Sequence, residues 1–250
     1  MSLPADWIVP DWPAPANVRA LITTRRGGPG GGASRGVYAG LNLGDRVGDE
    51  AAAVAQNRAL LRGHLPGEPV WLRQVHGTRV VEAVPGSAGE EADAAVAREP
   101  GRVCAVLTAD CLPVLLADDA GTVVAVAHAG WRGMAAGVIE SAVRAIGASP
   151  PSLLAYLGPA IGGAAYEVGA DVRDAFLTQD AGAEGAFVAR GNGKYLADLY
   201  RLARERLTRL GCTRVYGGRL CTYSEPARFY SFRRDGVTGR MASLIWIEPA

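Results

Sequence analysis

Two apolar runs joined by a very short turn constrain the fold of this chain more than any other feature. Residues 113–117 and 122–127 have the composition of buried strands, and Asp118-Asp-Ala-Gly121 lies between them. A parallel crossover needs roughly a dozen residues or more, so this connection requires an antiparallel hairpin. The pair therefore argues against a sheet of regularly alternating, parallel βα units.

Other periodic segments extend this prediction to the whole chain. Apolar residues recur at helical spacing in four segments, residues 50–65, 133–146, 171–177 and 196–210. Strand-like runs are more numerous and cover residues 71–75, 79–84, 102–108, 113–117, 122–127, 153–157, 214–223 and 243–247. Many strands interleaved with few helices predict an α+β fold, a mixed α/β sandwich.

Length and composition predict one domain and a small-molecule partner. The 250 residues contain no linker, repeat or charge block, so we expect a single domain over residues 1–250. Apolar residues make up 49% and charged residues 20%, as in ordinary globular proteins. The net charge is +1 and the arginines are scattered, which does not favour a nucleic-acid partner.

The sequence also predicts a cytoplasmic location. The first residues lack the basic start and apolar core of a signal peptide, and no apolar run reaches membrane-spanning length. The four cysteines form no CxxC pair and are expected to be reduced, so we predict no disulfide framework.

His76, Cys111 and His128 each follow or end a strand-like run, and strand ends can converge in space. Two imidazoles and a thiolate suit zinc, and three protein ligands leave a fourth position open, as in catalytic sites. Their spacing matches no zinc-finger pattern, so two hydrogen-bonded histidines and one buried thiol remain an alternative. The pattern indicates either a metal centre or a Cys/His catalytic pair.

Three further residues are candidates for the chemistry. Asp110 places a carboxylate beside Cys111 in an apolar stretch, where it is expected to orient a ligand or accept backbone N–H groups. Arg132 at the predicted start of a helix could meet an anion or simply be solvated. Arg233 lies in Phe229-Tyr-Ser-Phe-Arg-Arg-Asp235, whose aromatic and cationic groups suit a planar base, although a strand with alternating faces explains the segment as well.

Motifs spread over nearly the whole chain carry a family resemblance. They are Thr23-Thr-Arg25-Arg-Gly-Gly28, Leu41-Asn42-Leu43-Gly44, Gln74-Val-His76-Gly77, Ala92-Asp93-Ala94, Thr108-Ala-Asp110-Cys111-Leu-Pro113, His128-Ala-Gly-Trp-Arg-Gly133, Leu157-Gly-Pro-Ala-Ile-Gly162, Tyr166-Glu-Val-Gly169, Phe229-to-Asp235 and Thr238-Gly-Arg240. In combination they resemble the YfiH family, labelled polyphenol oxidase or laccase-domain proteins and associated with purine nucleoside phosphorylase and adenosine deaminase activity.

The resemblance implies a zinc-dependent enzyme in a fold related to bacterial toxin cysteine deamidases. Its expected reactions are phosphorolysis of adenosine- or inosine-type nucleosides and deamination of adenosine. It implies zinc ligands at His76, Cys111 and His128, and positions near the substrate for Arg25, Asn42 and Arg132. One departure is visible, because Gly163-Ala164-Ala165 stands where family members often have cysteine.

Two alternative activities remain. In a Cys/His amidohydrolase, a class associated with editing of cell-wall precursors, Cys111 would be the nucleophile, His128 the base and Asp110 or a backbone carbonyl the orienting group. Copper is the other alternative. Three histidines cannot supply a multicopper cluster, but a single copper ion at the His/Cys/His set would be compatible with polyphenol oxidase activity.

Overall fold

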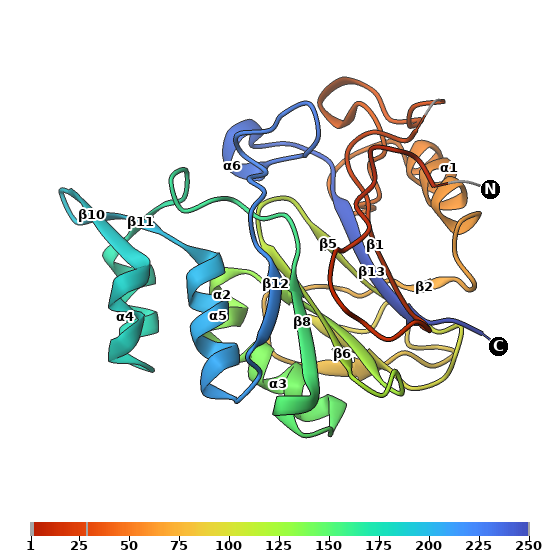
Figure 1. Ribbon diagram of the computed structural model, residues 1–250. Coiled ribbons are helices and arrows are strands. Elements are labelled where there is room, and N and C mark those ends of the chain that lie inside the picture. The colour runs from red at the N-terminus through yellow and green to blue at the C-terminus, as the bar shows by residue number, and fades with distance from the viewer. Residues whose placement is uncertain (1–2, 29, 250) are drawn as a thin grey trace.

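A computed structural model describes residues 3–28 and 30–249 of the chain (Figure 1). Residues 1, 2 and 250 of the predicted domain, and residue 29, lie outside this part. One sheet has the strand order β1 (Val18–Ile22), β13 (Met241–Ile247), β5 (Val103–Thr108) and β2 (Pro69–Val70). A larger sheet has the order β12 (Arg214–Gly217), β8 (Leu153–Leu157), β6 (Leu112–Asp118), β7 (Val124–Ala129), β4 (Ala94–Ala97) and β3 (Val80–Glu82).

Helices and a small third sheet complete the fold. The helices are α1 (Ala51–Arg62), α2 (Trp131–Ala136), α3 (Val138–Ile146), α4 (Ala170–Leu177), α5 (Leu199–Arg209) and the single turn α6 (Phe232–Asp235). The third sheet contains β10 (Phe187–Gly191), β11 (Lys194–Ala197) and β9 (Glu167–Gly169). Short 3₁₀ turns lie at Gly36–Tyr38, Pro150–Ser152 and Ala181–Ala186. The predicted α+β class is confirmed.

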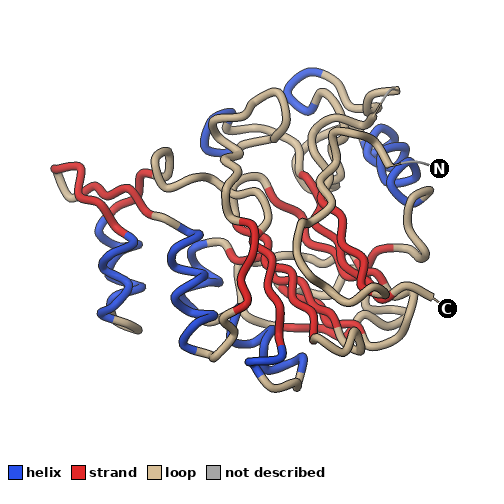
Figure 2. The backbone as a smooth tube through the Cα atoms, viewed as in Figure 1, coloured by secondary structure: helices blue, strands red, loops and turns tan. Residues whose placement is uncertain are grey.

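The two large sheets pack face to face, with helices outside each of them (Figures 1 and 2). Strand β13 shows how the sequence specifies this: Ile245 and Ile247 face the core between the sheets, whereas Leu244 and Trp246 face the core shared with α1. Residues of α3 and α5 form a third core against the opposite face of the larger sheet. Burying each large aliphatic side chain stabilises this arrangement by about 1.5–3 kcal/mol.

The predicted hairpin is confirmed and fixes a register that matters for the site. Strands β6 and β7 pair antiparallel, with Leu112 opposite Ala129 and Pro113 opposite His128. Asp118 closes the turn between them, because its carboxylate accepts hydrogen bonds from the backbone N–H groups of Thr122 and Val123. Cys111, just before β6, is therefore brought beside His128.

The strand expected at residues 71–75 was wrong. This segment is extended but makes only an isolated bridge between Arg73 and Glu91. The side-chain amide of Gln74 pairs with both the N–H and the C=O of Leu107 on β5, where a strand would use its backbone. The backbone is thus left available for other partners.

Glycines in the left-handed region correct two other boundaries. Gly137, with φ of 102°, divides the helix expected at 133–146 into α2 and α3. Gly217 and Gly218, with φ of 71° and 76°, end β12 well before residue 223. Strands β1, β2, β4, β9, β10 and β11 were not predicted. Strand β4 reads Ala-Ala-Val-Ala, and small residues carry a weak strand signal even where all four are buried.

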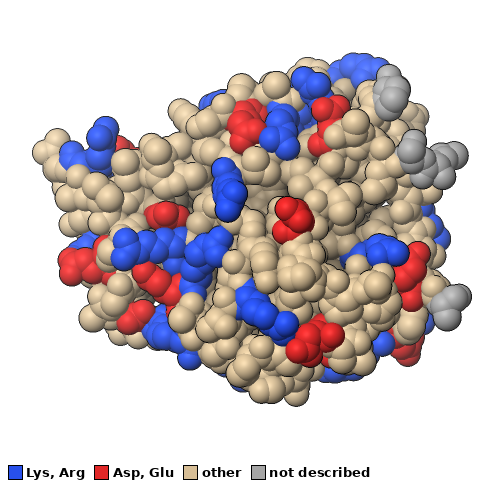
Figure 3. Space-filling view, in the orientation of Figure 1, with Lys and Arg blue, Asp and Glu red and all other residues tan. Residues whose placement is uncertain are grey.

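All four cysteines are free, as expected. Cys104 and Cys212 are buried, and Cys221 is half-buried. Among the described residues, no helix combines the length and apolar character needed to cross a membrane. Cationic and anionic side chains are interspersed on the face shown in Figure 3.

Candidate metal centre and substrate pocket

The sheet brings the three predicted metal ligands together. One donor atom from each of His76, Cys111 and His128 lies within 4.8 Å of the other two, and the Cys111 Sγ is 3.8 Å from the His76 Nε2. The two imidazole rings meet edge to face, with centroids 4.8 Å apart. This convergence agrees with the expectation that these strand ends meet, and it gives the three residues the geometry of a group that can hold a metal ion.

The space around the cluster suits a metal ion. A Cβ atom added at Gly130 would lie 2.9 Å from both the Cys111 Sγ and the His76 Cδ2, so only glycine leaves room beside the donors. Two imidazoles and a thiolate form a borderline-soft donor set that fits zinc, and the open side of the cluster faces a pocket. The residues present therefore fit the implied metal.

Asp93, for which the sequence suggested no role, is the central polar partner of the cluster. Its fully buried carboxylate accepts a hydrogen bond of 2.8 Å from the His128 Nδ1. It also accepts hydrogen bonds from the backbone N–H groups of Val75, His76 and Gly77, at 3.1, 2.9 and 2.7 Å. The available signal was a carboxylate between two alanines, Ala92 and Ala94, since a charge buried there must have partners.

The charges of the cluster support one another. Burial opposes ionisation of Cys111, but the positive charge of His128 and hydrogen bonds from His128 and His76 outweigh it and lower the pKa of Cys111 to about 6. Burial also opposes a charged His128, yet the Cys111 thiolate and Asp93 raise its pKa to about 9. Without a metal, Cys111 and His128 form a thiolate–imidazolium pair at neutral pH.

A pocket of about 570 Å³ opens directly above this cluster. Four arginines contribute to its walls: Arg46, Arg132, Arg233 and Arg240. Aromatic surface comes from Trp131, Tyr166 and Phe232. The guanidinium group of Arg132 stacks on Trp131 at 4.3 Å and that of Arg233 on Tyr166 at 5.0 Å. The pocket thus combines positive charge with planar apolar surface.

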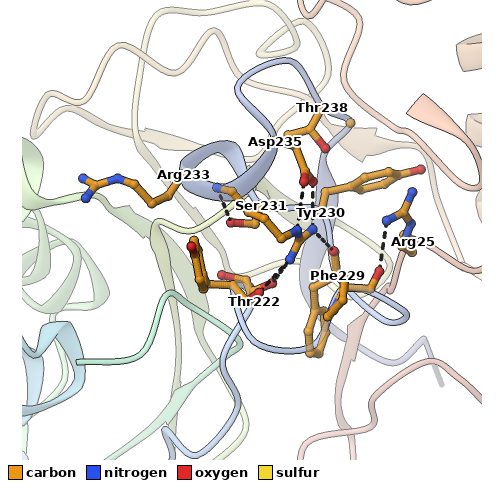
Figure 4. A network of polar contacts seen from close by, with 12 residues as sticks. Arg25, Thr222, Phe229, Tyr230, Ser231, Arg233, Asp235 and Thr238 are labelled. Atoms are coloured by element: carbon orange, nitrogen blue, oxygen red, sulfur yellow. Dashed lines mark hydrogen bonds and ion pairs between the residues drawn. The ribbon is translucent and has the colours of Figure 1, made fainter. Parts of the chain in front are cut away.

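Asp110 lies in the pocket wall and anchors the loop that carries Arg233. Its carboxylate accepts hydrogen bonds from the Thr222 hydroxyl at 2.5 Å, the Ser231 hydroxyl at 3.0 Å and the backbone N–H of Arg233 at 2.7 Å. Figure 4 shows these partners, with Arg233 pointing away from the other labelled side chains. The group that orients His128 is therefore Asp93 and not Asp110, because Asp110 is occupied by the loop.

Arg234 completes the anchoring of this loop. Its guanidinium group donates to the backbone oxygens of Thr222, Tyr223 and Phe229 and pairs with Asp235. The alternation of aromatic and cationic residues in this segment therefore separates two roles. Arg234 holds the loop, whereas Phe232, 58% exposed, and Arg233 line the pocket.

Arg25 and Asn42 are not brought to the metal cluster. Arg25 stacks on Tyr230 (Figure 4) and donates to the backbone oxygens of Pro226 and Ala39. With Pro226 and Ala39 it lines a cavity separate from the pocket at the metal cluster. Asn42 is fully buried, and its amide oxygen accepts hydrogen bonds from the N–H groups of Gly44 and Arg240. Substrate contact by these two residues stays a prediction that the pocket geometry does not favour.

Arg240 and Arg46 are pocket residues to which the sequence analysis gave no role. Arg240 donates to the backbone oxygens of Thr238 and Gly239, and burial lowers its pKa. Arg46 is exposed at the rim. Isolated arginines give no local signal of function, so only the folded chain identifies them.

A mixed α/β sandwich with a metal-capable His/Cys/His cluster below an arginine-lined pocket has the features of a small-molecule enzyme. Residues 19–248 match the family model described as multi-copper polyphenol oxidoreductase laccase. The chain belongs to this family, and its resemblance to the YfiH proteins is confirmed.

Individual relatives agree with this assignment. The chain is 53% identical over 243 residues to a protein of Pseudomonas aeruginosa named purine nucleoside phosphorylase, covering 97% of this chain and 98% of that one. It is 51% identical to purine nucleoside phosphorylase YfiH of Escherichia coli, covering 96% and 98%. A crystal structure of a Neisseria meningitidis protein superposes with a TM-score of 0.92 at 52% identity, covering 98% of this chain and 100% of that one.

Proposed function

We propose that this protein is a zinc-dependent enzyme that cleaves adenosine- and inosine-type nucleosides with phosphate and also deaminates adenosine. One observation carries the proposal: a metal-capable cluster and four arginines share one pocket of about 570 Å³. A nucleoside and a phosphate ion need this combination, because phosphate is bound by arginine forks and a purine by planar apolar surface. The relatives are named purine nucleoside phosphorylases, which supports purine nucleosides as the substrate class.

In this proposal, different residues of the pocket bind the metal, the phosphate and the base. His76, Cys111 and His128 would hold zinc, which supplies Lewis-acid activation of a water or substrate oxygen when bound. Arg132 and Arg233 hold phosphate against the ribose, so that a phosphate oxygen forms the new bond to the anomeric carbon as the bond to the base breaks. The exposed ring of Phe232 offers a stacking surface to the base.

The first test combines metal content with turnover. Protein purified without a metal-affinity column is analysed for zinc and copper by mass spectrometry and assayed with adenosine or inosine, with and without phosphate. We expect zinc near one equivalent and base release that depends on phosphate. Zinc without turnover of either nucleoside would overturn the substrate assignment. Copper at the site together with phenol oxidation would favour the oxidase alternative.

The Cys/His amidohydrolase remains as a second candidate because the geometry contains its parts. Cys111, His128 and Asp93 form a nucleophile, a base and an orienting carboxylate, and the pKa of Cys111 is lowered. A thiol-directed probe separates the two functions. A zinc-bound thiolate is protected from alkylation, whereas a nucleophilic Cys111 in the purified protein reacts at once.

A further inference from the structure

We infer that Asp93 is a positioning residue that preforms the metal centre, because one carboxylate holds both the imidazole of His128 and the backbone of His76 in place for metal binding. All four hydrogen bonds accepted by this carboxylate come from the two segments that carry these ligands. The inference rests on the metal centre of the proposed function but not on its substrate.

The hydrogen bond to Asp93 fixes the tautomer of His128. An ionised carboxylate has no hydrogen to donate, so the proton in the 2.8 Å contact with Asp93 is on the His128 Nδ1. When a metal takes the place of the other ring proton, the lone pair used for binding is on Nε2, the nitrogen that Asp93 leaves free to face Cys111. The backbone N–H of His128 also donates to the Asp93 carbonyl oxygen at 2.7 Å, which fixes the position from which the ring extends.

Asp93 also holds the backbone of His76. The φ of 60° at His76 lies in the left-handed region, which is strained for a residue other than glycine. Three successive N–H groups, from Val75 to Gly77, converge on the Asp93 carboxylate and form an anion-binding nest that offsets this strain. Without the carboxylate, these N–H groups would lose their partner and His76 would lose the contact that holds its conformation.

The hydrogen bonds of the Asp93 carboxylate all go to the two segments that carry metal ligands. Its carboxylate is fully buried and bonds only to these two ligand segments, so losing its charge acts directly on the cluster. Asp118 offers a matched comparison in the same sheet. It is also buried and accepts three hydrogen bonds, but all of them come from Thr122 and Val123 in its own turn.

The test compares Asp93→Asn with Asp118→Asn. An amide at residue 93 keeps one acceptor oxygen and turns its NH2 group either toward His128 Nδ1 and the His76 N–H or toward the N–H groups of Val75 and Gly77, so that one of the two sets of hydrogen bonds is lost. We expect Asp93→Asn to weaken zinc binding by about 10- to 100-fold, the usual cost of losing a partner of a metal ligand. Asp118→Asn should lower the thermal midpoint and leave zinc affinity unchanged.

Zinc affinity is measured by competition with a chromophoric chelator. The thermal midpoint of each variant is measured in the absence of metal. Unchanged zinc affinity in Asp93→Asn would overturn the inference, as would an equal loss in both variants. Because this readout needs no nucleoside, it can succeed even where the proposed turnover fails.

A second measurement needs no variant and covers the case in which Asp93→Asn does not fold. Long-range ¹H–¹⁵N spectra of the zinc-loaded wild-type protein report which nitrogen of His128 carries the proton. We expect a slowly exchanging, downfield Nδ1 proton and zinc on Nε2. Zinc on Nδ1, or an Nδ1 proton in fast exchange with water, would show that Asp93 does not position the ring.

Discussion

Two buried carboxylates, Asp93 and Asp110, support different parts of the site. Asp93 is directed to the metal ligands, where it bonds His128 and the backbone around His76. Asp110 is directed to the pocket wall, where it bonds Thr222, Ser231 and the backbone of Arg233. From sequence, Asp110 looked like the functional carboxylate because it is adjacent to Cys111, yet the histidine that partners this cysteine is oriented by Asp93.

Backbone strain accompanies both carboxylates. Among described residues other than glycine, positive φ values occur at His76, Asp110 and Asn192, and the first two belong to this site. Strained backbone persists where surrounding hydrogen bonds hold it, and such positions gather at functional sites. Separate hydrogen-bond networks therefore support the metal ligands and the pocket wall. A substitution can disturb one network without the other.

The largest effect is expected when a ligand on the Asp93 side is removed. His76→Ala should weaken zinc binding by more than about 100-fold, since losing a ligand exceeds the cost of losing its hydrogen-bond partner. The side chain is exposed, so the free energy of unfolding of the metal-free protein should change by only about 0.5 kcal/mol. Chelator competition and urea unfolding measure the two quantities, and global unfolding of the variant would show that the metal is structural.

On the pocket side, Arg132→Ala should lower kcat/KM for phosphate by about 10- to 100-fold, the expected loss for a charged hydrogen bond. Zinc content should stay at the wild-type level. Arg219→Ala is the matched control, because Arg219 is exposed and lines a different cavity. Equal losses in both variants would exclude a specific phosphate contact at Arg132.

The pH dependence of Cys111 tests the charge balance that Asp93 supports. In the metal-free protein, the pKa of Cys111 is lowered to about 6, so the thiolate predominates above that pH and the neutral thiol below it. The raised pKa of about 9 keeps His128 charged up to that pH. The rate of Cys111 alkylation by iodoacetamide should therefore rise near pH 6 and reach a plateau by about pH 7. For an ordinary thiol the rise is centred about two pH units higher. A rise centred near pH 8.5 would contradict the ion pair.

The smallest effect on the metal is expected at the second carboxylate. Asp110→Asn weakens three hydrogen bonds and should lower the free energy of unfolding by about 1–3 kcal/mol, while zinc affinity stays unchanged. Urea unfolding and chelator competition on the same preparation give both values. If zinc affinity fell as far as in Asp93→Asn, the two networks would not be separate.

Local sequence rules alone specify the sheet hairpin and, through it, the approach of two of the three metal-capable residues. The turn after Ala117 is too short for anything but an antiparallel pair, and that register places Pro113 opposite His128, with Cys111 next to it. The consecutive apolar residues of β13 likewise indicate a strand with both faces buried, as in a sandwich. These are local rules, which a single chain displays without its fold.

Only the tertiary structure decided the remainder of the site. Asp93 bonds His128, which is 35 residues away in the sequence, and Arg233 donates to the backbone oxygen of Glu167, which is 66 residues away. No periodicity or turn rule links such positions. The same physics separates Arg233, which lines the pocket, from Arg234, which binds the loop carbonyls. Neighbouring residues of one chemical type acquire different roles because the packed backbone around them presents different partners.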